Sequence, residues 1–145
     1  MKFITGNARH QAQIFCLDTY IHQNNDVRFI DLFVDALPLA DFGFSIEVKT
    51  TGRPPYHPAD ILKLFLYGYL NQIRSSRKLE LECQRNIELM WLMNELVPDH
   101  NTIANFRRDH SDAIRKVFKA TVSMAKNFEL IGGKLIAGDG TKLRA

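Results

Sequence analysis

Apolar residues recur at helical spacing along most of this chain. In residues 26–37, "DVRFIDLFVDAL", they lie three and four positions apart, which is the pattern of an amphipathic helix. Asn25 or Asp26 is suited to cap the start of this helix, and Pro38 closes it. The next residues, 39–57, predict an irregular, partly extended connection. The first part of the chain is therefore expected to hold one helix and a long connection.

The most apolar stretch predicts a central helix over residues 59–73, "ADILKLFLYGYLNQI". Its apolar residues occupy almost every side of a helical wheel, which is typical of a buried helix. Pro58 is suited to its first turn, where the missing N–H costs nothing. Gly68 costs about 1 kcal/mol relative to alanine in the middle of a helix, so it predicts the close approach of another helix.

Shorter helices are expected between residues 75 and 110. Ser75 or Ser76 can cap "SRKLELECQRN", "IELMWLMNEL" forms a second apolar segment that Pro98 stops, and Asn101 or Thr102 can cap a third helix. Consecutive short helices suit helix-turn-helix pairs that contact DNA. A small bundle with a solvated polar face gives the same pattern, and that alternative stays open here.

The last helical pattern begins at Ser111 and ends at Gly132–Gly133. Only after those glycines does a strand pattern appear, at Leu135–Ile136–Ala137. The expected fold is all-α, a multi-helix bundle with helix-turn-helix-like pairs, plus one C-terminal β-strand.

Composition narrows the class of protein. Of the 145 residues, 46% are hydrophobic and 24% charged, which is ordinary for a folded domain. Cys16 and Cys83 lie far apart without zinc-ligand spacing, so we expect a reduced, cytoplasmic protein. Because no segment reads as a signal peptide or as a membrane span, we expect no membrane partner.

Positive charge gathers at the C-terminal end, although the net charge is only +3. Such asymmetry indicates a polyanionic partner, while solubility alone also tolerates it. Asn105, Arg107 and Arg108 are expected outside a helix whose apolar residues point inward, where arginine and asparagine can contact phosphates and base edges. Arg115 and Lys119 are expected on the polar side of the following helix.

One acidic residue stands apart from the helices. Asp139 lies between Gly138 and Gly140, directly after the predicted strand, where neighbouring side chains leave a metal ion or a phosphate free to approach. A hairpin turn at "GDGT" is the alternative. One carboxylate does not suffice for phosphoryl transfer, which uses several carboxylates around one or two Mg²⁺ ions.

Three motifs occur together in this chain, namely "GRPPYHP" before a long apolar helix, "SSRKLELEC", and "PDHNTIANFRRDH". Together they resemble the N-terminal domain of bacterial insertion-sequence transposases of the InsH-like group. The resemblance covers most of the chain from about residue 20 onward. The matching positions are Gly52, Arg53, Pro54, Tyr56, Pro58, Ser76, Arg77, Glu80, Cys83, Pro98, Asp99, Thr102, Ile103, Phe106 and Arg107.

The resemblance implies a DNA transposition enzyme whose ribonuclease H-like catalytic domain carries two aspartates and a glutamate around two Mg²⁺ ions. Asp139, in "DGTK", matches the first of these aspartates and would be both a catalytic residue and a metal ligand. The expected domains are residues 1–131, helical, and residues 132–145, the first strand of the catalytic domain. The other two acidic residues would lie beyond residue 145, so we expect no cofactor in this fragment, Mg²⁺ in the full-length enzyme, and no activity of the fragment alone.

The leading expectation for function is a DNA-binding and assembly region that recognises the terminal inverted repeats of the element. Its DNA-contacting residues are expected to be Arg53, Asn105, Arg107, Arg108, Arg115 and Lys119. The alternative is a helical module that joins transposase subunits, as in a homodimer, with little specific DNA recognition. The breadth of apolar sequence at residues 59–73 and 87–96 supports that alternative.

Overall fold

Helices make up the regular structure of the residues described by the computed structural model, which are 2–46 and 51–127. They are α1 (Leu17–Tyr20), α2 (Asp26–Asp35), the 3₁₀ turn η1 (Leu39–Phe42), α3 (Pro58–Leu70), α4 (Ser76–Arg85), α5 (Ile87–Leu92), α6 (His100–Asp109) and α7 (Ser111–Asn127). The all-helical prediction is confirmed for these residues. The predicted strand, and the domain boundary predicted after residue 131, lie outside them.

Three predicted helix starts are confirmed by capping contacts. The Asn25 side chain accepts a hydrogen bond from the Val27 amide at 2.9 Å at the start of α2. Ser75 caps α4 in the same way. Pro58 occupies the first turn of α3, whose cap is His57. These side chains satisfy amide groups that have no partner within the helix itself.

Two helices end earlier than the apolar pattern predicts, because residues with positive φ break them. α3 ends at Leu70, and Gln72 has a φ of 60°. α5 ends at Leu92, well before Pro98, since Asn94 and Glu95 have φ of 51° and 64°. Left-handed backbone cannot continue a right-handed helix.

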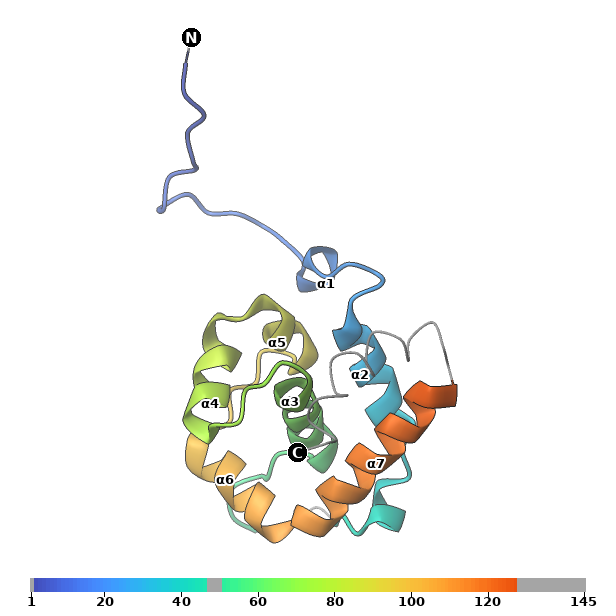
Figure 1. Ribbon diagram of the computed structural model, residues 1–145. Coiled ribbons are helices and arrows are strands. Elements are labelled where there is room, and N and C mark those ends of the chain that lie inside the picture. Colours follow the sequence, from blue (N-terminus) through green and yellow to red (C-terminus); the bar gives the residue numbers. More distant parts are fainter. Residues whose placement is uncertain (1, 47–50, 128–145) are drawn as a thin grey trace.

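α3 is the central helix, with the other long helices arranged around it (Figure 1). Its residues 61–68 are all buried, as the sequence predicts. Gly68 is in close contact with its surroundings, because a Cβ atom added there would lie 2.6 Å from the Ile73 carbonyl oxygen and 3.0 Å from Leu79 Cδ2 of α4. The predicted close approach of another helix is therefore confirmed.

Lys63 is the exception in this apolar helix, since it is only 5% exposed. Its ammonium lies 2.7 Å from Asp31 and 2.8 Å from Asp35, both on α2. Burial acts to lower the pKa of Lys63, but the hydrogen bonds to the two carboxylates outweigh burial and raise this pKa above its ordinary value. The two ion pairs join α2 to α3.

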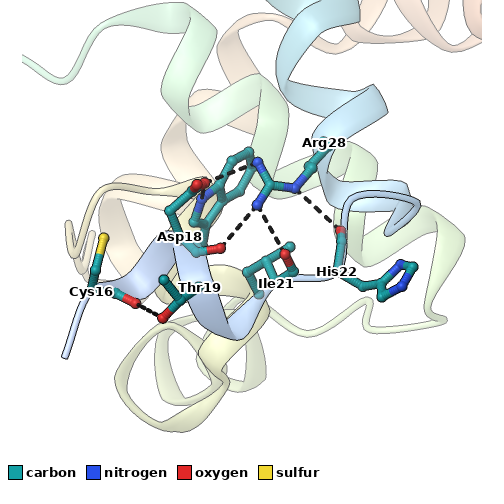
Figure 2. A network of polar contacts seen from close by, with 7 residues as sticks. Cys16, Asp18, Thr19, Ile21, His22 and Arg28 are labelled. Carbon is teal, nitrogen blue, oxygen red and sulfur yellow. Dashed lines mark hydrogen bonds and ion pairs between the residues drawn. The ribbon is translucent and has the colours of Figure 1, made fainter.

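A second polar cluster attaches α1 to the helices. The Arg28 guanidinium faces Asp18 at 2.9 Å, as Figure 2 shows, and lies 4.9 Å from the centre of the Trp91 ring. The Trp91 indole donates a hydrogen bond to the same carboxylate, and these contacts lower the pKa of Asp18. Residues 2–16, which precede α1, run away from the helices (Figure 1).

Candidate nucleic-acid interface

α6 carries three of the predicted DNA-contacting residues. It begins at His100, earlier than predicted, because the Asp99 carboxylate caps it by accepting a hydrogen bond from the Thr102 amide at 2.7 Å. That backbone hydrogen bond lowers the pKa of Asp99. The predicted caps, Asn101 and Thr102, are wrong, since both belong to the first turn of the helix.

α6 packs against the protein through one apolar face, and most of its other residues are exposed to solvent. Ile103 is fully buried, and Phe106 is half-buried and stacks on Phe44 and Phe65. Asn105 and Arg108 are exposed. The prediction that Ile103 and Phe106 point inward is therefore confirmed, and it leaves the polar residues of α6 accessible.

α7 follows α6 after a single residue and packs against it. Its apolar side is anchored by Ile114 and Val117, which are buried. Arg115 and Lys119 are exposed, and because they lie four residues apart they share one side of the helix. Cationic side chains thus emerge from two consecutive helices.

Arg107 is held in a defined position. Its guanidinium lies 4.9 Å from the centre of the Phe65 ring of α3 and donates a hydrogen bond to the Arg74 carbonyl oxygen at 3.0 Å. The side chain is nevertheless exposed. Since its rotamer is already ordered, Arg107 would lose less conformational entropy than a free surface arginine on binding an anion.

Among the described residues, acidic neighbours pair with only two of these four cations. Within the described parts of the chain, Arg107 and Lys119 have no ion pair; Arg108 contacts Asp109 at 3.1 Å, and Arg115 is 3.9 Å from Asp112. Exposed pairs such as the last two contribute little to stability, so phosphates can compete for both arginines.

A groove of about 470 Å³ lies between α3, α6 and α7. Aromatic and arginine side chains dominate its lining, namely Phe65, Tyr69, Phe118, Arg74, Arg107 and Arg115. Sequence reasoning missed Arg74 and the aromatic residues. Arg74 stands directly before the Ser75 cap, in a part of the chain where basic and acidic residues balance, so no excess of positive charge marks it.

The remaining predicted site residues are not brought into this group. Arg53 is exposed in the connection before α3, and the described contacts do not link it to α6 or α7. Asp139 lies outside the described residues. Within residues 2–46 and 51–127, no three histidine, cysteine or acidic residues gather as metal ligands would. In the same ranges, no helix is both long enough and apolar enough to cross a bilayer.

The fold and this surface define a class, that of small all-helical domains whose exposed arginines and lysines lie on neighbouring helices. Residues 15–109, more than half of the chain, match the family described as Transposase domain (DUF772). The chain belongs to this family, and its role is related to transposition. Searches of curated proteins and of solved structures return no match.

Proposed function

We propose that this helical domain is the N-terminal DNA-binding region of an InsH-like insertion-sequence transposase. The observation that supports the proposal best is the set of exposed cations on α6, the last helix within the matched residues 15–109, and on α7, which follows it. Arg107 and Lys119 have no ion pair among the described residues. Cationic side chains that neutralise phosphates provide most of the affinity of DNA-binding proteins.

Different residues of the surface suit different parts of DNA. Arg107, Arg115 and Lys119 are suited to phosphates. A cation that contacts the phosphate backbone binds it whatever the neighbouring base is. Asn105 and Arg108 on α6 are suited to base edges, where asparagine pairs with adenine and arginine with guanine. α6 would then be the recognition helix, and α4, which packs against it but is separated from it in the chain by α5, would support it from behind.

The catalytic part of the proposal follows the family resemblance. Asp139 would be the first of three acidic ligands of the Mg²⁺ ions. When bound, Mg²⁺ would stabilise the attacking and leaving oxygens at phosphorus. The helical domain would contribute by holding the DNA end, and the terminal inverted repeats of the element are its proposed target.

Fluorescence anisotropy with labelled duplex tests the DNA-binding proposal. The chain should bind a duplex of the terminal repeat more tightly than a scrambled duplex of the same length. Lys119→Ala should weaken binding to both and reduce the slope of log affinity against log salt by about one. Arg85→Ala is the matched control, because it removes an exposed cation of α4 that Glu82 already pairs at 2.6 Å.

Equal loss of affinity in the Lys119→Ala and Arg85→Ala variants would show that only net charge matters, and the proposed surface would be wrong. Binding that does not respond to salt would contradict the proposal of phosphate contacts altogether. A preference for the terminal repeat that is lost in Asn105→Ala would support base readout by α6.

Assembly of transposase subunits is a second candidate function. The apolar sequence that suggested it does not supply the contact surface, but another segment can. The apolar residues 61–68 are buried within a single chain, so they offer no surface for another subunit. The segment before α1 offers a different one, since Phe3, Ile4 and Ile14 are 95%, 103% and 106% exposed. These side chains are the candidate contact residues, because large apolar surfaces left exposed mark interaction sites.

Sedimentation of the chain without DNA tests this second candidate. We expect a dimer that becomes a monomer when Phe3, Ile4 and Ile14 are all replaced by serine. These residues lie outside the helices, so the variant should keep the helical circular dichroism of the parent. A parent chain that sediments as a monomer at all concentrations would remove the candidate.

A further inference from the structure

The groove between α3, α6 and α7 combines two chemical properties that an ordinary duplex-binding surface does not need. Its interior is aromatic, with Tyr69 and Phe118 rings 4.7 Å apart between centres and tilted by 30°. Both rings are only half-buried, so part of their surface faces the groove. The volume of about 470 Å³ lies within the range of small-ligand sites.

The rim of the groove is strongly positive. Arg74, Arg107 and Arg115 line it, and no acidic residue among those that the structure describes does. Arg74 has no ion pair among the described residues, and the nearest carboxylate to Arg115 is Asp112, 3.9 Å away and itself exposed. Three arginines around an aromatic interior favour a ligand with a flat apolar part and negative charges beside it.

A nucleotide has that combination, with a planar base between backbone phosphates. In paired duplex DNA the bases are stacked on one another and cannot reach an aromatic groove on a protein surface. Proteins that bind unpaired strands use aromatic side chains for the bases and a positive groove for the backbone. An acidic protein segment would match the charge, but it would have no general need for two adjacent aromatic faces.

We therefore propose that the groove binds an unpaired nucleotide of the DNA, with its base against Tyr69 and Phe118 and its flanking phosphates near Arg74, Arg107 and Arg115. The proposal rests on the proposed DNA-binding function and adds a site for unpaired DNA. Arg107 supports it in particular, because its guanidinium is already oriented by Phe65 and by the Arg74 carbonyl oxygen.

The test uses two duplexes of equal length that share the same labelled strand with one 2-aminopurine. In the first a thymine pairs with the 2-aminopurine, and in the second an abasic site stands opposite it and leaves it unpaired. The full chain should bind the second about 5- to 150-fold more tightly, which is the effect of stacking one base on aromatic side chains. Emission of the 2-aminopurine should fall on binding, because stacking quenches it. Phe118→Leu should abolish both the preference for the unpaired base and the quenching.

Three outcomes would overturn the proposal. Equal affinity for the two duplexes, with unchanged 2-aminopurine emission, would exclude the unpaired-nucleotide site and leave duplex binding intact. A preference that persists in a folded Phe118→Leu variant would place the unpaired base elsewhere. Displacement of DNA by a polyglutamate peptide containing phenylalanine, again with unchanged emission, would identify an acidic protein segment as the occupant. No binding of either duplex would instead reject the proposed function itself.

If Phe118→Leu does not fold, the emission of 2-aminopurine with the parent chain still decides the matter. Phe118→Trp provides a further check, since it keeps an aromatic face in the groove and should retain both the preference and the quenching. Circular dichroism and thermal melting of each variant identify those that fold like the parent.

Discussion

Single residues show where a sequence pattern stops being informative. Lys63 falls within an almost wholly apolar helix, and the pattern alone gives no reason to bury its charge. The Lys63 ammonium can be buried because it forms ion pairs with Asp31 and Asp35, which lie four residues apart on α2. The pairing depends on how α2 packs against α3, so it could not be read from either segment separately.

Lys63→Met tests the role of this ion pair. The variant should unfold more easily by about 1–3 kcal/mol at pH 7, since it leaves two partly exposed carboxylates without their cation. The pKa of Lys63 is raised in the folded protein, so its stabilising contribution is complete below the ordinary lysine pKa and is lost as the pH rises through the folded value.

Urea denaturation between pH 8 and pH 12 provides the measurement. The difference in free energy of unfolding between the parent and Lys63→Met should stay constant up to about pH 10 and then shrink. A difference that grows with pH would mean that the pKa of Lys63 is lowered, and the two ion pairs would be unimportant.

At the scale of elements, most helices were predictable because local signals agree with one another. Asn25, Ser75 and Pro58 mark helix starts by side-chain chemistry that acts over two or three residues. The helix ends were less predictable, since the left-handed conformations of Gln72 and Glu95 have no strong signature in those residue types. Asn94 is of a type that is enriched in this conformation, but an asparagine alone does not fix where a helix ends. α1 and η1, each only four residues long, also gave no periodic pattern.

At Gly68, the packing of α3 requires a residue without a side chain. Gly68→Ala should destabilise the domain by about 1–3 kcal/mol despite the better helix propensity of alanine, because the Ile73 carbonyl and Leu79 would have to move. Gly6→Ala is the control, since no atom lies within 4 Å of its added Cβ and the residue is exposed. Thermal melting that shows Gly68→Ala to be as stable as the parent would contradict the close packing of α3 and α4.

At the scale of the whole molecule, the sequence predicted the cations of the candidate interface but not the groove beside them. Arg107, Arg108, Arg115 and Lys119 follow from exposure on amphipathic helices, which periodicity describes well. The groove forms where Tyr69 of α3 meets Phe118 of α7, and those residues lie far apart in the chain. Such a site requires the packing of three helices, which no local pattern contains.

The most direct test of the account is chemical footprinting of the full chain with and without terminal-repeat duplex. Lysines are acetylated, arginines are modified with phenylglyoxal, and each site is quantified by mass spectrometry. DNA should protect Arg107, Arg115 and Lys119 several-fold, while Arg85 on α4 reacts equally with and without DNA. Protection of Arg85 together with unchanged reactivity of Arg107, Arg115 and Lys119 would contradict the claim that α6 and α7 form the DNA-binding surface.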